Sequence, residues 1–236
     1  MGCTSAAADV PPAATARAPH SASAISNPAV KPGVVATGAL TSQDGKTSGH
    51  IVVTARDDGD FDVTFSDFHT STTGDLQLEL SAVPFNSAVS CFADTGLKVN
   101  LNAVSPGTYL LAGGVDPIHG DPSFLDSALL TQPVIPVASG KCLNTVVGSA
   151  SLAWTLPDMR PNLHVVDSGI RTGGTGVVTM VDGKPASYAV APDDVMKAIA
   201  ERFGITVDDI LYLNPTRMGG TMALAGETLN LSKKLR

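Results

Sequence analysis

The chain has 236 residues and a formal net charge of −7 at pH 7, because 22 Asp and Glu residues outnumber 15 Lys and Arg residues. Such an acidic surface repels the phosphates of nucleic acids and the headgroups of anionic lipids, so we expect neither as a direct partner. No stretch of the sequence is apolar for long enough to cross a bilayer as a helix.

The first 33 residues are rich in Ala, Pro and Ser. They hold too few large apolar side chains to offset the entropy of ordering, so residues 1–33 are predicted to form a disordered tether. The tether begins MGCTS (Met1–Ser5), which resembles the exit side of a bacterial lipoprotein signal. The resemblance implies that Cys3 carries a lipid and anchors the protein to a membrane. The alternative is an exposed cysteine on a disordered tail.

Residues 34–174 are predicted to form a β-sandwich domain, whose ligand the sequence does not indicate. Apolar and polar residues alternate in run after run, as they do in strands with one buried face. The sequence DDGD (Asp57–Asp60) between two such runs is a hairpin signature. Roughly seven or eight short strands of this kind make a sandwich the economical architecture. The alternating runs lie at 51–53, 61–65, 76–80, 97–101, 108–111, 151–154 and 164–166.

Two cysteines of this domain, Cys91 and Cys142, are free to pair in an oxidising compartment. A disulfide closing a loop of about fifty residues contributes on the order of 4 kcal/mol in the chain-entropy model. The alternative is two buried free thiols.

The sequence carries little sign of catalysis. The loop DPIHGD (Asp116–Asp121) holds three potential metal ligands, but loops of this composition are usually turns. No nucleophile elbow, phosphate loop, zinc-protease motif or cofactor fingerprint occurs. We therefore expect no metal, no cofactor and no enzymatic activity.

Residues 175–185 are predicted to be a β-hairpin connector. The β-type runs Val177–Val181 and Lys184–Tyr188 flank Asp182-Gly183, which favours a tight turn. The return strand of this hairpin is also the first strand of the last domain. We therefore expect limited motion between the two domains.

Residues 186–236 are predicted to form a small domain with the order strand, helix, helix, strand. Asp193 and Asp194 are expected to cap the first helix, whose apolar stripe runs from Val195 and Met196 to Phe203. Gly204 is expected to end that helix.

Thr206 is expected to cap the second helix, and Asn214-Pro215 to stop it. The alternation around Thr228–Leu231 predicts a closing strand.

Four separated signatures in this domain resemble the lysin motif (LysM) family along nearly its whole length. They are YAVAPDD (Tyr188–Asp194), AIAERFG (Ala198–Gly204), LNP (Leu213–Pro215) and LAGETLNL (Leu224–Leu231). Members of the family bind polymers that contain N-acetylglucosamine, peptidoglycan or chitin, in a shallow groove. The resemblance implies a groove lined by Pro192, Asp193, Asp194, Val195 and Met196 on one side and by Asn214, Pro215, Thr216 and Arg217 on the other.

The implied groove departs from the family at the start of the first helix. The family usually has Gly-Asp-Thr-Leu where this chain has Asp193-Asp194-Val195-Met196. The change adds a carboxylate and removes a hydroxyl at the expected sugar surface. We expect binding through backbone hydrogen bonds to acetamido groups and through apolar contact with Val195 and Met196. The alternative is a LysM-like fold kept for packing.

Together these features predict a mostly β protein with a small α+β module. The predicted function is non-enzymatic: a lipid-anchored, extracytoplasmic protein of the bacterial cell envelope that binds peptidoglycan. One alternative is a cell-wall hydrolase or other envelope enzyme in which the LysM-like domain only targets the enzyme. Another is a protein-interaction module with a degenerate groove.

Overall fold

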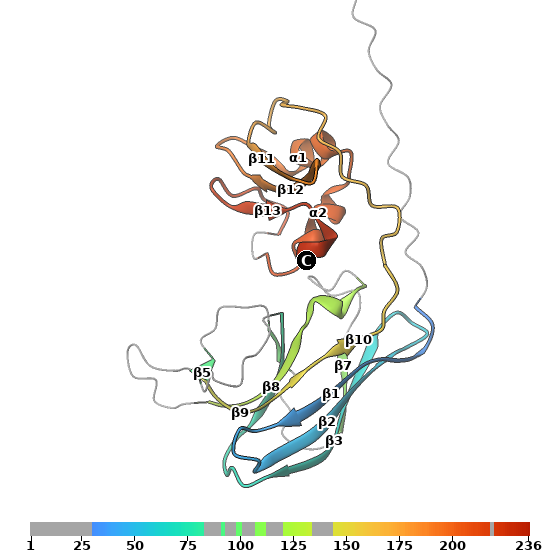
Figure 1. The fold of residues 1–236 in the computed structure, drawn as a ribbon, viewed down its shortest axis with the longest axis vertical. Helices are drawn as coiled ribbons and strands as arrows, with labels where there is room; N and C mark the ends of the chain where they lie inside the picture. Colours follow the sequence, from blue (N-terminus) through green and yellow to red (C-terminus); the bar gives the residue numbers. More distant parts are fainter. Residues whose placement is uncertain are drawn as a thin grey trace, which may run out of the picture.

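In the computed structural model, the described residues are 30–82, 91–92, 98–100, 107–111, 120–133, 144–217 and 220–236. The fold is mostly β, with a ten-stranded sheet, a three-stranded sheet and two α-helices (Figure 1). No helix in this part of the chain is both long and apolar enough to span a membrane. The predictions for Cys3, for nearly all of the tether, for the Cys142 thiol and for the side chain of Cys91 lie outside the described residues.

The ten-stranded sheet has the order β6-β4-β8-β9-β1-β2-β3-β7, with β10 paired to β1 and β5 paired to β9. All its pairings are antiparallel. Its strands are β1 (Gly33–Thr41), β2 (Thr47–Ala55), β3 (Phe61–Thr70), β4 (Gln77–Ser81), β5 (Cys91–Phe92), β6 (Lys98–Asn100), β7 (Gly107–Leu111), β8 (Ser127–Pro133), β9 (Asn144–Ser151) and β10 (Ala153–Trp154). The short 3-10 helix η1 (Pro122–Phe124) precedes β8.

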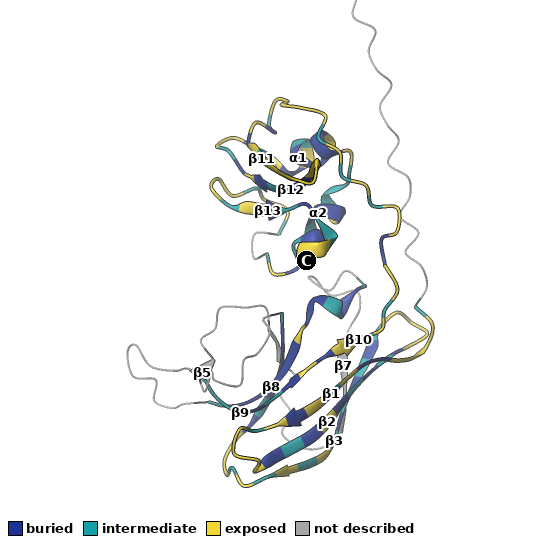
Figure 2. Ribbon diagram, in the orientation of Figure 1, coloured by how far each residue is buried: buried dark blue, intermediate teal, exposed yellow. Residues whose placement is uncertain are grey.

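The sheet is curled, so that its two halves enclose one core (Figure 2). Alternate residues of β2 point inward: Ile51 and Val53 are buried, while His50, next to Ile51 in the same strand, is exposed. This alternation is the pattern that predicted the strands. The core includes Leu40, Ile51, Val53, Phe61, Val63, Phe65, Leu78, Leu80, Leu125, Ala128 and Leu130.

The predicted β-rich domain is therefore confirmed, but its architecture is different from a two-sheet sandwich. β1 pairs with β2 along one side and with β9 and β10 on the other. These pairings on both sides of β1 join the two halves, and the described strands form one continuous sheet.

The predicted strand at residues 164–166 is wrong. After β10 the chain leaves the sheet and runs as an irregular segment toward the C-terminal unit (Figure 1). There the backbone N–H groups of Val166 and Ser168 donate to the carbonyls of Phe203 and Arg202. Because its partners are the end of a helix, this segment has no neighbouring strand with which to form a ladder. The junction between the two parts thus falls near Thr155, earlier than the predicted boundary at Gly174.

The C-terminal unit contains the predicted order of strand, helix, helix, strand, with one added strand before it. Its three-stranded sheet has the order β11-β12-β13. Its elements are β11 (Val177–Val181), β12 (Lys184–Ala189), α1 (Met196–Phe203), α2 (Val207–Leu213), β13 (Thr228–Asn230) and the 3-10 helix η2 (Lys233–Leu235). The core that joins them consists of Tyr188, Val190, Met196, Ile199, Ala200, Phe203, Ile210, Leu229 and Leu231.

Several local signals in this unit are confirmed. The β11–β12 hairpin turns at Asp182 and Gly183, whose φ angles of 51° and 74° suit a type I′ turn. Gly204 ends α1 in the left-handed conformation. Thr206 and Asp209 form a capping box at the start of α2.

The predicted cap of α1 is wrong. The N-cap position is occupied by Val195, and no side chain caps the helix. Asp194 lies one residue earlier and binds other partners, because its carboxylate points into the fold.

Candidate functional site

The loops that flank the predicted groove lie at the same end of the three-stranded sheet. β12 and β13 are antiparallel, with Ala189 at the end of β12 opposite Thr228 at the start of β13. The loop that leaves β12 and the loop that enters β13 must therefore meet. They do so through two backbone hydrogen bonds of 2.9 Å between Val190 and the turn at Gly226-Glu227.

Glu227 ties the second loop to the first. Its backbone carbonyl accepts the Val190 N–H, and its carboxylate accepts from Arg217 at 2.7 and 2.8 Å and from the Leu224 N–H at 2.7 Å. The Arg217 guanidinium also donates to two carbonyls in the loop before β13, and its side chain is only 7% exposed. Arg217 therefore shapes the loop and has little surface left for a ligand. Sequence reasoning did not assign Glu227 to the site, although it stands ten residues after Arg217 with the opposite charge.

Asn214 fixes the other end of this loop. Its side-chain amide donates to the carbonyls of Ile210 and Asn230 at 2.8 and 2.9 Å, and its side-chain carbonyl accepts the Asn230 N–H at 2.7 Å. These bonds connect the end of α2 to β13. Pro215, next in the chain, is buried. Both residues therefore hold the loop in place from its buried side.

Asp194 anchors the first loop. Its carboxylate accepts five hydrogen bonds: from the N–H and hydroxyl of Thr175, from the N–H groups of Gly176 and Ala191, and from the hydroxyl of Tyr188 at 2.5 Å. Burial alone would raise the pKa of Asp194, but the hydrogen bonds from Tyr188, Thr175 and Ala191 outweigh it and hold the pKa below 3.8. Burial, followed by the bond to Asp194, raises the pKa of Tyr188 to about 12.

This electrostatic arrangement predicts loss of stability in acid. The pKa of Asp167 is also lowered, chiefly by the hydrogen bond from Arg202. A carboxyl whose folded-state pKa is depressed stabilises the fold above its unfolded pKa of 3.8, and this contribution is lost as pH falls through the folded pKa. We expect the melting temperature to change little between about pH 7 and pH 5 and to fall below about pH 4. The melting temperature followed by circular dichroism measures this, and a profile with Asp194→Asn should be flatter. An equal acid dependence of the melting temperature in the parent and in Asp194→Asn would contradict a stabilising role of the ionised Asp194 carboxylate.

The nine residues of the predicted groove therefore divide into two groups. Pro192, Asp193, Val195 and Thr216 are exposed, with Val195 at 54%. Asp194, Met196 and Pro215 are buried, and Asn214 and Arg217 are occupied by loop contacts. The expected ligand contact with Met196 is wrong, because this side chain is 3% exposed and belongs to the core.

Asp193 has a backbone conformation that favours glycine. Its φ angle is 65°, in the left-handed region that glycine adopts without cost. The next residues are held by the Val195 N–H, which donates to the Gly173 carbonyl at 2.8 Å. The exposed carboxylate of Asp193 thus stands at a turn whose shape the surrounding contacts determine.

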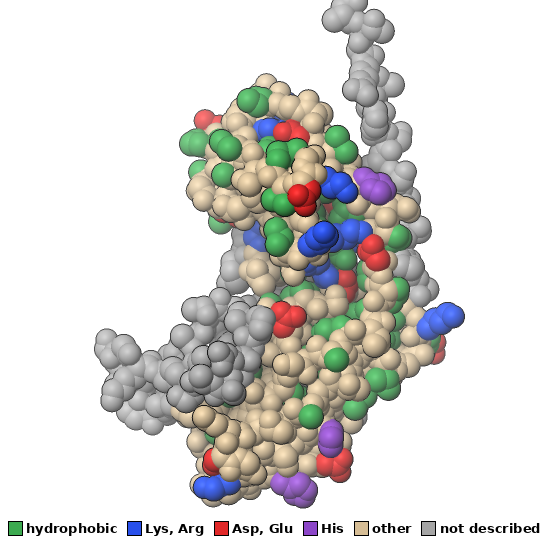
Figure 3. All heavy atoms as spheres, in the orientation of Figure 1, with side chains coloured by type: hydrophobic (Ala, Val, Ile, Leu, Met, Phe, Trp, Pro, Cys, Tyr) green, Lys and Arg blue, Asp and Glu red, His purple; other side chains and the backbone are tan. Residues whose placement is uncertain are grey.

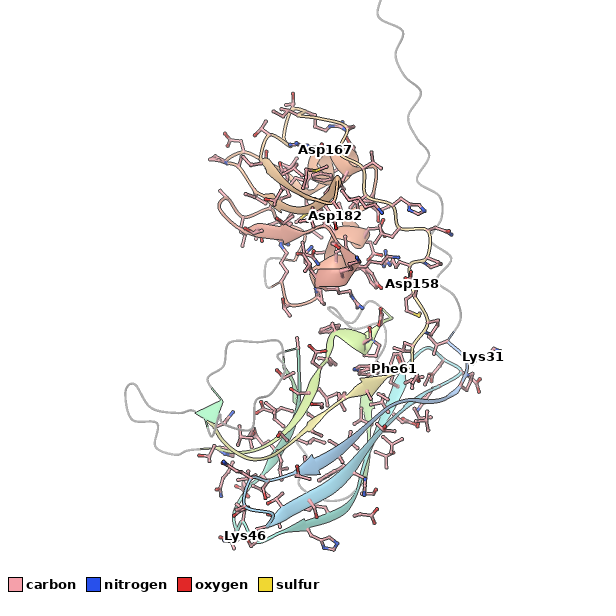
Figure 4. All side chains as sticks on the ribbon, in the orientation of Figure 1. Lys31, Lys46, Phe61, Asp158, Asp167 and Asp182 are labelled. Atoms are coloured by element: carbon pink, nitrogen blue, oxygen red, sulfur yellow. The ribbon has the colours of Figure 1, made fainter. Side chains whose placement is uncertain are left out.

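A separate cavity of about 360 Å³ lies where the C-terminal unit meets η1 of the β domain. Its charged groups are paired: Arg236 with Asp121 at 2.5 Å, and Lys233 with Asp158 at 2.7 Å (Figure 4 labels Asp158). Burial alone would raise the pKa of Asp158. The hydrogen bond from Lys233 outweighs this effect, so the pKa lies below its usual value. The cavity is lined by Asp121, Ser123, Phe124, Leu156, Pro157, Asp158, Tyr212, Lys233 and Arg236.

Two carboxyls in one cleft are the feature that would favour a glycosidase. A general acid must be protonated near neutral pH, however, and Asp158 is held ionised by its lysine partner. Asp121 is engaged by Arg236 and by the Tyr212 hydroxyl. The arrangement is that of a junction held by ion pairs.

The chain was compared with protein-family models, with curated proteins and with solved structures, and none of the three comparisons found a match.

Proposed function

We propose that the C-terminal unit is a LysM-like module that binds an N-acetylglucosamine polymer of the bacterial cell envelope, peptidoglycan in the first place. The observation that supports this most is the convergence of the two loops at one end of the sheet, tied together through Glu227. Of the predicted groove residues, Pro192, Asp193, Val195 and Thr216 are exposed on this surface. Small exposed polar and apolar groups on a rigid backbone suit the flat faces and acetamido groups of a sugar polymer.

The rest of the proposal follows from the sequence. With a lipid on Cys3, the protein is held at a membrane and the β domain stands between the anchor and the sugar-binding unit. A shallow single site of this kind binds weakly, with a dissociation constant on the order of 0.1–1 mM. Because the lipid already holds the protein near the cell wall, the local concentration of glycan is high, and the two attachments together hold the protein more tightly than either alone.

Retention on insoluble peptidoglycan tests the proposal. The full chain is expected to sediment with peptidoglycan, and Val195→Asp is expected to lose about tenfold in affinity, since it places a charge where an apolar contact is proposed. Val195 is exposed, so the substitution leaves the core intact.

The matched control is Val166→Asp. Val166 is 65% exposed and lies at the far end of α1, beside Phe203. The control should be retained like the parent. An unretained parent that still melts cooperatively would contradict glycan binding by this unit.

Asp193→Gly is expected to act in the opposite direction. Glycine relieves the positive φ at this position by up to about 1 kcal/mol and removes an exposed carboxylate from the proposed sugar surface. We expect a higher melting temperature and stronger retention on peptidoglycan. Weaker retention would instead assign the Asp193 carboxylate a direct role in binding.

A further inference from the structure

The strand β11 forms an edge of the three-stranded sheet. β12 lies between β11 and β13, and within the described residues no strand pairs with the outer side of β11. In an antiparallel ladder, alternate residues direct their backbone N–H and C=O groups to opposite sides. The outer side of β11 therefore carries backbone groups that a further strand can bind.

The side chains of β11 are unusually apolar for an exposed edge. Val177, Met180 and Val181 are 71%, 50% and 55% exposed, and Thr179 is exposed as well. Natural edge strands are commonly protected by a charged residue, a proline or a β-bulge. Val177–Val181 contains no charged residue and no proline, and the register of the β11–β12 ladder shifts once, between Thr179 and Met180. Hydrophobic side chains are visible on the surface of the C-terminal unit in Figure 3. The exposed residues of β11 are therefore those of an apolar, unprotected edge.

The sequence of β11 is complementary to itself. In an antiparallel pair centred on Thr179, Val177 stands opposite Val181 of the second copy, and Val178 stands opposite Met180. Both of these pairs are apolar, and apolar cross-strand pairs stabilise a sheet. The chain as a whole carries a net charge of −7, so contact between two copies is opposed least where both surfaces are uncharged. β11 is an uncharged segment of this kind.

We propose that β11 pairs with β11 of a second copy of this chain, antiparallel and about a two-fold axis at Thr179. The pairing extends the three-stranded sheet across both copies. An interface of one short strand is small, so the dimer forms at high local concentration, such as on a membrane or a polymer. The proposal depends only on β11 and does not rest on glycan binding.

Sedimentation velocity of the full chain tests the proposal. We expect the parent to pass from monomer to dimer between about 1 µM and 1 mM. The double variant Val177→Lys, Val181→Lys is expected to remain monomeric over the whole range, since the pairing places these two positions opposite each other and would bring like charges together. Both side chains point to solvent, so equal melting temperatures establish that the variant folds.

The matched control is Val34→Lys, which places a lysine on an exposed valine of β1, away from β11. It should dimerise like the parent. A parent that stays monomeric at every concentration, or a double variant that dimerises equally well, would overturn the proposal. Larger, undefined aggregates without a dimer would also overturn it, because a two-fold pair of edges is closed.

The register is tested by Thr179→Cys. Residues opposite each other at the axis of an antiparallel pair are close enough for a disulfide. Under mild oxidation we expect covalent dimer in this variant well above the level in the parent, which carries Cys3, Cys91 and Cys142. A matched Val166→Cys variant should stay at the parent level. Equal cross-linking of both variants would contradict the two-fold axis at Thr179.

Discussion

Asp194→Ala is expected to destabilise the C-terminal unit by about 3–5 kcal/mol, because it removes the acceptor of several buried donors at once. The hydroxyl of Tyr188, the N–H of Gly176 and the N–H of Ala191 all point at this carboxylate. Once it is removed, they have neither this acceptor nor free access to water. The segment that precedes β11 and the loop after β12 should loosen together.

Chemical denaturation followed by far-UV circular dichroism measures this effect, since the two α-helices belong to the C-terminal unit. The matched control is Asp193→Asn, which removes the neighbouring exposed carboxylate and keeps a residue that tolerates positive φ. The control should lie within about 0.5 kcal/mol of the parent. Equal effects of the two substitutions would show that Asp194 does not anchor the loop.

Arg236→Ala is expected to uncouple the C-terminal unit from the β domain. The Arg236 side chain is 7% exposed and donates to the Asp121 carboxylate and backbone carbonyl, to the Ser123 hydroxyl and to the Tyr212 carbonyl. Its guanidinium also lies 4.1 Å from the centre of the Tyr212 ring. Removing one partner of a buried ion pair costs about 3–5 kcal/mol, because the other charge stays buried.

Two probes separate the parts in this experiment. The single tryptophan, Trp154, lies in β10 and donates to the Leu125 carbonyl, so its fluorescence reports on the β domain. Circular dichroism of the helices reports on the C-terminal unit. The two unfolding transitions should coincide in the parent and separate in Arg236→Ala. Lys234→Ala, at an exposed cation in the same segment, is the control. Coincident transitions in Arg236→Ala would contradict coupling through this residue.

Features determined by neighbouring residues could be predicted from the sequence. The capping box of Thr206, the left-handed Gly204 and the turn at Asp182-Gly183 each depend on residues within one turn of chain. Alternation likewise located most strands of the β domain. It failed at residues 164–166, because a strand also needs a neighbour, which a periodic pattern does not supply.

Contacts between distant residues could not be predicted. Arg160 pairs with Asp209 across 49 residues, and Arg236 pairs with Asp121 across 115. Asp194 was predicted to cap α1 but anchors a loop instead, for the same reason. Its partners Thr175 and Gly176 precede it by 19 and 18 residues. The glycines just before β11 are the one feature of the sequence that indicates this contact. A Cβ atom at Gly176 would stand 2.1 Å from the Ala189 carbonyl oxygen, so only glycine allows the backbone to approach so closely.

Glycan binding at the loops after β12 and before β13 is tested most directly by a nuclear magnetic resonance titration of the full chain with a chitin hexasaccharide. We predict saturable shifts of the amide signals of Asp193, Val195 and Thr216, with a dissociation constant on the order of 0.1–1 mM. Signals from the junction, such as those of Asp158 and Lys233, should stay in place. An unchanged spectrum at several times that concentration, or shifts confined to the junction, would contradict binding at these loops.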